Sequence, residues 1–292
     1  MTRMVVLGDV MVDVVARLAG PVAPGSDSPA RVAFQGGGQG ANTAAWLAVA
    51  GAQVALVGRV GADAAGRSAA EELGTLGVDV RLAVDAERPT GTCVVLVAAH
   101  GERTMFPDAG ANEGLVEPDD DLFVRGDHLH VAGYALLREG SGAGAQSAIE
   151  RARVAGMTVS VDPSSAALLS GALRQLGRGA DLVVPNSLEA SALTGLPDPS
   201  AAAQALAESF SEVVVTLGER GALWTDGSEV LTVAAYEADP VDTTGAGDAF
   251  AAGLLAARTR DAGPREALEA GCALAARAIA MTGARPNSTA LS

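Results

Sequence analysis

Short apolar runs alternate along most of this chain with longer stretches in which apolar residues recur at helical spacing. Such alternation predicts an α/β fold, in which a parallel sheet is covered by helices on both faces. The expected strands are residues 4–7, 54–60, 128–132, 158–161, 182–184 and 212–217. The expected helices are residues 41–50, 64–76, 144–155, 166–176, 187–194, 247–257 and 264–281. Two shorter runs, residues 222–225 and 230–233, predict an antiparallel edge.

Two segments break this rhythm. Residues 10–34 are rich in Pro, Gly and alternating positions, and residues 90–106 carry two strand-like runs joined by His100, Gly101 and Glu102, which is a hairpin signal. We expect both segments to leave the main sheet and pair as a small β-lid over the substrate site. Peripheral strands are the alternative. The predicted division is a core of residues 1–12, 36–88 and 109–292, with a lid of residues 13–35 and 89–108.

Composition narrows the class of protein. The 292 residues suit one large α/β domain with an insertion, or two small domains. The net charge of −15 argues against nucleic acid or an anionic membrane as a partner. No signal peptide and no run of membrane-spanning length is evident, so we expect a cytoplasmic protein. Cys93 and Cys272 lie far apart in apolar contexts and are expected to be buried free thiols.

The chain contains no lysine, because all 20 of its basic residues are arginine. This excludes a Walker A lysine, a lysine of the protein-kinase type and a Schiff-base lysine. If the protein handles nucleotide phosphates, it must do so with backbone amides, arginine and metal.

The most informative motif is the glycine-bearing turn at residues 242–250, which runs directly into an apolar helix. Unpaired N–H groups at a helix start attract anions, and glycines let a phosphate approach the backbone closely. Asp248 stands where this helix begins. A carboxylate beside an anion cradle makes sense if it takes a proton from a hydroxyl while the cradle holds phosphate. The alternative is that Asp248 merely caps its helix.

Four further motifs follow predicted strands, so they converge on one edge of the sheet. Asp13 stands in the first and could accept hydrogen bonds from hydroxyls or, alternatively, be a turn residue. The glycine cluster of residues 36–40 with Asn42 forms the second, which suits vicinal hydroxyls or, alternatively, a tight turn with a capping Asn. Asn186 and Glu189 lie on one helix face, where their oxygens suit Mg²⁺ through waters or, alternatively, form a capping box. Residues 216–221 suit nucleotide contact or a hairpin-like turn.

Taken together, these motifs resemble the ribokinase-like sugar kinases of the PfkB carbohydrate kinase family, in order and over nearly the whole chain. The resemblance implies a three-layer α/β sandwich with a mostly parallel central sheet and a β-lid. It also implies transfer of the γ-phosphate of ATP to a hydroxymethyl group, with Mg²⁺.

The resemblance also implies a role for each matching residue. Asp248 would be the base, and Gly245, Ala246 and Gly247 would form the anion hole. The remaining positions are implied as follows: Asp13, Gly37, Gly38, Gln39 and Asn42 for the sugar, Asn186, Thr216, Gly218 and Gly221 for the nucleotide, Glu189 and Asn186 for Mg²⁺ through water, and Asp242, Thr244 and Gly283 for a monovalent cation such as K⁺.

The acceptor stays open at this stage. Ribokinases usually carry lysine where Gln39 stands, which argues against ribose. A nucleoside kinase of the same family is the close alternative, since Phe34 and Phe106 of the expected lid could stack on a base. A non-catalytic sugar or nucleotide sensor is an alternative of another class. The lid strands also suggest a homodimer formed through the lid.

Overall fold

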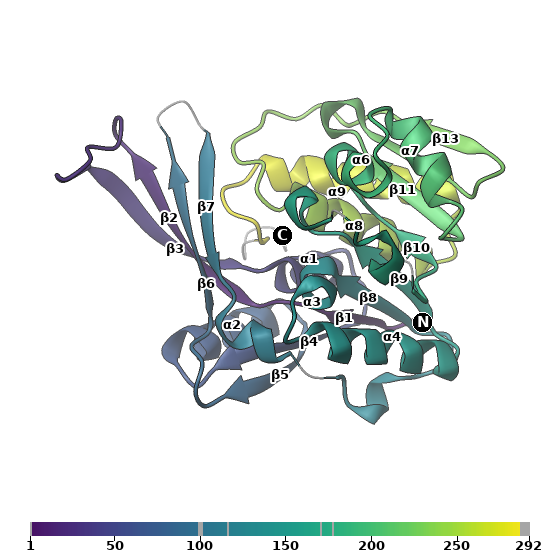
Figure 1. Cartoon of the computed structure of the whole chain (residues 1–292), viewed down its shortest axis with the longest axis horizontal. Coiled ribbons are helices and arrows are strands. Elements are labelled where there is room, and N and C mark those ends of the chain that lie inside the picture. Colours follow the sequence, from purple (N-terminus) through teal and green to yellow (C-terminus); the bar gives the residue numbers. More distant parts are fainter. Residues whose placement is uncertain (1, 99–101, 116, 170, 177, 287–292) are drawn as a thin grey trace.

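The computed structural model describes residues 2–98, 102–115, 117–169, 171–176 and 178–286. A nine-stranded sheet runs through the centre of the molecule, and a four-stranded sheet stands at one side of it (Figure 1). Helices cover both faces of the large sheet. The three-layer α/β fold class expected from the alternating pattern is therefore confirmed, as is the presence of a second, small sheet.

The central sheet is parallel except at one edge, where two antiparallel strands extend it. In spatial order its strands are β13 (Val230–Val233), β12 (Ala222–Thr225), β11 (Glu212–Thr216), β10 (Leu182–Val183), β9 (Thr158–Asp162), β8 (His128–Ala132), β1 (Met4–Leu7), β4 (Val54–Gly61) and β5 (Asp79–Asp85). The antiparallel edge predicted at residues 222–225 and 230–233 is thus confirmed. Strand β5 was not expected, because its charged ends and partly exposed positions give no continuous apolar run.

Side chains of alternate residues enter two different cores. Met4 and Val6 of β1 pack into one apolar cluster, while Val5 and Leu7 pack into the other, because successive side chains of a strand point to opposite faces. The first cluster is closed by α1 (Gln39–Val49), α2 (Ala64–Thr75), α8 (Ala246–Arg258) and α9 (Pro264–Ile279). The second is closed by α3 (Gly133–Leu137), α4 (Gly142–Ala155), α5 (Leu173–Leu176), α6 (Ser187–Thr194) and α7 (Pro199–Leu206).

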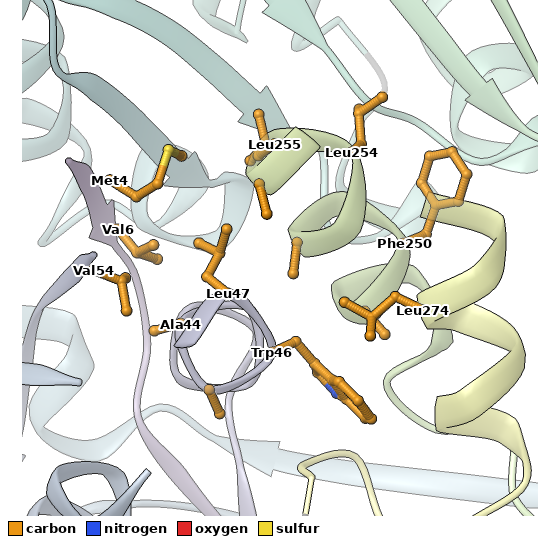
Figure 2. Close-up of a cluster of buried hydrophobic side chains, with 14 of the residues drawn as sticks. Met4, Val6, Ala44, Trp46, Leu47, Val54, Phe250, Leu254, Leu255 and Leu274 are labelled. Atoms are coloured by element: carbon orange, nitrogen blue, oxygen red, sulfur yellow. The ribbon is translucent and has the colours of Figure 1, made fainter. Parts of the chain in front are cut away.

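Helix α1 is held between the sheet and the two C-terminal helices. Figure 2 shows Leu47 of α1 among Met4, Val6 and Leu255, while Trp46 points to the side of Leu274. Trp46 is fully buried and its indole Nε1 donates to the Ala284 carbonyl at 2.9 Å. This packing fixes α1 against α8 and the segment that follows α9, so that residues far apart in sequence meet at one place.

The small sheet is formed by the two segments that break the helical rhythm. Its order is β3 (Ala30–Gly37), β2 (Met11–Leu18), β6 (Gly91–Val97) and β7 (Arg103–Asp108), with β2 and β6 parallel and the outer pairs antiparallel. The expectation that both segments leave the main sheet is confirmed. His100 and Gly101 of the predicted hairpin turn lie outside the described residues.

One predicted helix was wrong and two helices were missed. Residues 166–176 form a 3₁₀ turn (Ala166–Leu168) and the separate short helix α5, with Gly171 in a left-handed conformation between them, which an α-helix cannot accommodate. Helices α3 and α7 were not expected; both are short, with five and eight residues. Cys93 and Cys272 are free and buried, as expected. Among the described residues, no helix is both long and apolar enough to cross a membrane.

Candidate active site

The turn before α8 presents backbone N–H groups to open space. Gly245 precedes the helix with φ of 77°, and a Cβ there would lie 2.5 Å from the Ala284 carbonyl oxygen, so only glycine fits. A Cβ on Gly247 would meet nothing within 4 Å. No side chain caps this helix start. The interpretation of Asp248 as a helix cap is therefore wrong. The Ala246 N–H donates to the Thr243 carbonyl at 3.4 Å, and the Gly247 N–H at the open start of α8 remains available to an anion.

The Asp248 carboxylate is held by a side chain from another helix. Asn42, buried in the first turn of α1, donates from Nδ2 to Asp248 Oδ2 at 2.9 Å. Burial raises the pKa of Asp248 to about 8; the Asn42 hydrogen bond opposes this rise, and the negative charges of Asp162 and Asp9 add to it. A carboxyl with a pKa near neutrality, fixed at an anion-attracting helix start, is suited to accept a proton from a hydroxyl.

Asn42 is in turn held in place by Arg285. The sequence motifs did not identify Arg285 as a site residue. It is 6% exposed, and its Nε donates to Asn42 Oδ1 at 3.1 Å. Its other nitrogens donate to the Gly37 carbonyl at 2.5 Å and to Glu72 at 3.2 Å. Since Arg285 occupies the oxygen of the Asn42 amide, the amide nitrogen faces Asp248. The one signal that could have identified Arg285 was its position directly after the Gly283-Ala284 turn in a chain without lysine.

The glycine cluster makes room for charged side chains. A Cβ on Gly36 would lie 2.2 Å from an Arg285 nitrogen, and a Cβ on Gly37 would lie 2.2 Å from the Asp13 carboxylate. Gly38 has φ of 93° and approaches the Asp9 carbonyl. Asp13 is 8% exposed, and burial raises its pKa to about 6, with Arg285 acting in the opposite direction. Predicted residues Asp13, Gly37 and Asn42 are thus brought together around Arg285, with Gly38 next to them in the chain.

Gln39 is engaged by a turn that follows β9. Its Oε1 accepts a hydrogen bond from the Ser164 hydroxyl, and the Ser164 N–H donates to Asp162 Oδ1 at 2.9 Å. Ser164 has φ of 76°, a conformation that costs a non-glycine residue of the order of 1 kcal/mol or more. Asp162 is 8% exposed, with its pKa raised by burial to about 6. Strain of this kind gathers at functional sites, and neither Asp162 nor Ser164 was among the predicted site residues.

Asn186 and Glu189 form the capping box that their spacing allows. Asn186 Oδ1 accepts from the N–H groups of Leu188 and Glu189, both at 2.9 Å, and Glu189 Oε2 accepts from the Asn186 N–H at 2.8 Å. Glu189 is nevertheless unusual for a cap. It is 6% exposed, and burial together with the nearby Asp162 charge raises its pKa to about 7. Glu189 and Asp162 are therefore two buried carboxylates that lie close together.

A cavity of about 580 Å³ adjoins the α8 start. Predicted residues Thr216, Gly218 and Gly221 line it together with Ala246 and Gly247, which directly precede Asp248. Its walls are mostly apolar, which suits the base of a nucleotide. The segment after β13 supplies a wall that the motifs did not predict. The lining residues on that wall and at the back of the cavity are Ala235, Tyr236, Glu237, Ala238, Pro240, Phe250, Cys272 and Ile279.

The residues of the expected cation loop also meet. Asp242 is 6% exposed; its Oδ1 accepts from the Thr244 N–H at 3.0 Å and from the Thr244 hydroxyl at 2.7 Å. Its Oδ2 accepts from the Gly283 N–H at 3.2 Å. Burial alone would raise the pKa of Asp242, but these hydrogen bonds and nearby Arg103 hold it below its usual value. The turn at residues 242–247 is thereby tied to the segment that carries Arg285.

Comparison with known proteins shows the family of this chain. The family model of the pfkB family carbohydrate kinases matches residues 1–290, so the chain belongs to that family and is a kinase. Among curated relatives, a ribokinase of Haemophilus influenzae is 29% identical over 85% of this chain and 82% of its own length. A fructokinase of Vibrio alginolyticus is 33% identical over 77% of each chain.

Solved structures give the same result. The crystal structure of adenosine kinase from Sinorhizobium meliloti superimposes with a TM-score of 0.89 at 26% identity, covering 99% of this chain and 97% of that one. Arabidopsis thaliana ribokinase complexed with ribose and ATP gives 0.84 at 26% identity, covering 100% and 98%. The family resemblance inferred from the motifs is confirmed, and so is the fold class.

Proposed function

We propose that this kinase transfers the γ-phosphate of ATP to a hydroxymethyl group of a sugar or sugar-like acceptor. The observation that carries the proposal is the position of Asp248. It is held by Asn42 at the open start of α8, directly after two residues that line a largely apolar cavity of about 580 Å³. A proton acceptor, an anion-binding helix start and a nucleotide-sized cavity are what in-line phosphoryl transfer needs.

In this proposal Asp248 is the general base on the acceptor hydroxyl. Gly245, Ala246 and Gly247 form the anion hole, where backbone N–H groups stabilise the charge that develops on the transferred phosphoryl group. Thr216, Gly218 and Gly221 hold the nucleotide in the cavity. Asn186 lies beside these nucleotide-site residues, because it forms an isolated parallel β-bridge with Thr216. The choice of ATP is supported by the likeness to Arabidopsis ribokinase, whose structure was solved in complex with ribose and ATP.

Mg²⁺ is proposed to accompany ATP, held through water by Glu189 and Asn186. The donor set fits, because Mg²⁺ prefers oxygen donors and Glu189 and Asp162 are buried carboxylates. Burial raises the pKa values of both, and the charge of Asp162 adds to the rise for Glu189, so a nearby cation would stabilise their charged forms. Among the described residues, no group of three potential ligands is placed to form a protein cage. Mg²⁺ usually keeps several of its waters and binds substrate phosphates, whose charge it neutralises, rather than a cage of protein ligands.

Asp13, Gly37, Gly38, Gln39 and Asn42 are proposed to bind the acceptor. The first two and the last are gathered around Arg285, while Gln39 is turned toward Ser164 and Asp162. Gln39 carries no charge, and its Oε1 is already engaged. This favours a neutral, hydroxyl-rich acceptor over one that needs a lysine at this position.

A nucleoside acceptor is the second candidate, supported by the likeness to the Sinorhizobium adenosine kinase. The positions of the two lid phenylalanines, however, argue against their stacking on a base. Phe34 pairs with Val14 across the small sheet, and Phe106 pairs with Val94, so both lie on the face opposite Asp13. They are 76% and 54% exposed. Rings on that face cannot stack on a base bound beside Asp13.

The small sheet is proposed to be the lid, with residues 13–35 and 89–108 as the movable unit and the rest of the chain as core. Its outer row of Phe34, Val14, Val94 and Phe106 is apolar and partly exposed, which suits a second copy of this chain. Dimerisation through this face remains a proposal, as does a cytoplasmic location. Light scattering of the wild type and of Phe34→Asp tests the dimer; a monomeric wild type at working concentration would contradict it.

A coupled assay for ADP release tests the function. Pentoses, hexoses, sugar phosphates, 2-keto acids and nucleosides are offered in turn, with Mg²⁺ and ATP. We expect one sugar class to raise ADP release far above the rate without acceptor. Asp248→Asn should bind ATP and acceptor normally, by calorimetry, yet lose about 10²–10⁴ in kcat.

Two outcomes would overturn the proposal. Near-normal turnover by Asp248→Asn would remove Asp248 as the base. Binding of sugar or nucleotide without any ADP release, across the whole panel, would identify the chain as the non-catalytic sensor instead.

A further inference from the structure

Two arginines of the small sheet reach across to the Asp242 carboxylate. Arg103 of β7 donates from one terminal nitrogen to Asp242 Oδ1 at 2.7 Å and from the other to the Thr244 hydroxyl. Arg17 of β2 lies 3.4 Å from Asp242 Oδ2. Arg103 is the closer and more buried of the two, with 27% of its side chain exposed against 45% for Arg17. The small sheet is thus joined to the start of α8 by a charged contact.

The loop expected to hold a monovalent cation does not fit one in this arrangement. Oδ1 of Asp242 accepts from Arg103, the Thr244 N–H and the Thr244 hydroxyl, and Oδ2 accepts from Gly283 and Arg17. Both oxygens are therefore saturated by donors. The adjoining cavity measures about 20 Å³, room for about one water molecule, and both arginines stand in its wall. A cation entering there would meet two guanidinium groups at once.

Resting on the proposed function, we infer that Arg103 supplies from the lid the positive charge that a monovalent cation would otherwise bring to Asp242. It is a positioning residue. It acts through Asp242 and Thr244 on the turn at residues 243–247, whose N–H groups receive the phosphoryl charge. Because Arg103 belongs to β7, it reaches Asp242 only when the lid lies against the core. Closure of the lid over the acceptor and completion of the anion hole are then one event.

A planar guanidinium is well suited to this position. Its two terminal nitrogens donate separately to a carboxylate and to a hydroxyl two residues apart in the chain, in a fixed planar geometry that the single nitrogen of an ammonium group does not reproduce. Truncation of the Arg103 side chain would leave the Asp242 carboxylate buried. Among the described residues, only Arg17 would then lie within ion-pair distance of it, at 3.4 Å. The carboxylate would then gain affinity for a small cation.

The test compares KCl with choline chloride at equal ionic strength, in the wild type and in Arg103→Met. Wild-type kcat and Tm should be the same in both salts. In Arg103→Met we expect kcat to fall about tenfold or more in choline chloride, because a displaced turn misplaces the anion hole. The KM for ATP should change little. KCl should restore part of kcat and raise the Tm of this variant in proportion to its binding.

Arg31→Met is the matched control, since Arg31 is an exposed arginine of β3 that pairs with Arg17 in the same sheet. It should behave as the wild type in both salts. Arg103→Lys keeps the charge but not the planar two-nitrogen geometry, and should lie between wild type and Arg103→Met in kcat. It also supplies the comparison if Arg103→Met fails to fold.

Activation of the wild type by K⁺ over choline would overturn the inference, and so would wild-type kcat in Arg103→Met. A loss of kcat in Arg103→Met without any effect of KCl on its kcat or Tm would also overturn it. The Tm readout needs no turnover. If no acceptor elicits ADP release, the proposed function fails, while the salt dependence of Tm still decides whether Arg103 takes the place of a cation.

Discussion

Asn42 donates to Asp248 with its amide nitrogen while its amide oxygen accepts from Arg285. One side chain thus joins the proposed base to a buried guanidinium, and each bond determines the direction of the other. The three residues come from the start of α1, the start of α8 and the segment after α9. Orientation of the base depends on that three-way contact.

Loss of Arg285 should therefore disturb the base as well as the fold. In Arg285→Met the Asn42 amide loses its fixed orientation, and Asp248 and Asp13 lose a neighbouring positive charge that lowers their pKa values. We expect kcat to fall about 10–100-fold, and the acid limb of kcat/KM to move to higher pH. A merely structural residue would not shift that limb. Glu72→Gln, which alters the partly exposed partner of Arg285, is the control and should leave the pH profile in place.

The activity of the wild type should rise with pH. Asp248 must be deprotonated to act as a base, and its pKa in the free protein is about 8. We expect kcat/KM to increase about tenfold per pH unit below that value and to level off above it. A kcat/KM that is flat between pH 5 and about 9 would contradict this assignment.

Stability should change in the opposite direction. The pKa of Asp248 in the folded protein, about 8, exceeds the ordinary value of 3.8 that applies to the unfolded chain. Between these values the folded protein holds a proton that the unfolded chain has released, so stability falls as pH rises through this window. Asp248→Asn removes that cost. Its Tm should exceed that of the wild type by a few degrees at pH 8 and match it near pH 4, as measured by scanning calorimetry. A lower Tm of the variant at pH 8 would show that the carboxylate is stabilising.

Substitutions at Gly245 and Gly247 distinguish the effect of backbone strain from the effect of filling the space that phosphate needs. Gly247→Ala places a methyl group in open space at the α8 start, where it should intrude on the anion hole and reduce kcat about tenfold or more. It should also raise stability slightly, because alanine is a better helix former. Gly245→Ala should instead lower the Tm, since φ is 77° and the Ala284 carbonyl lies in the way.

Gly74→Ala is the matched control for these changes. Gly74 lies in α2, and a Cβ added there would meet nothing within 4 Å, so the variant should gain helix stability and keep full activity. If Gly247→Ala behaves like Gly74→Ala in kinetic assays, the helix start is not the anion hole.

Several features were predictable because they depend on local sequence. Short apolar runs located nearly every strand of the central sheet, stretches of helical spacing located most of the helices, and the glycine turn at residues 242–247 marked the start of α8. The order of motifs along the chain sufficed to indicate the family. Residues 166–176 were mistaken for one helix because a positive φ at Gly171 interrupts an otherwise helical composition.

Other features could not be predicted, because they arise from contacts across more than a hundred residues of chain. The contacts of Arg103 with Asp242 and of Ser164 with Gln39 follow from no local pattern. For the contact of Arg285 with Asn42, the one signal was the position of Arg285 directly after the Gly283-Ala284 turn. The same is true of the direction in which Phe34 and Phe106 face, which strand pairing decides. The amino-acid sequence by itself determined the α/β class and the absence of lysine chemistry, and it indicated the residues that we propose for phosphoryl transfer. Only the tertiary structure decided which arginines lie beside these residues, because a buried charge is stable only where the fold places a partner for it.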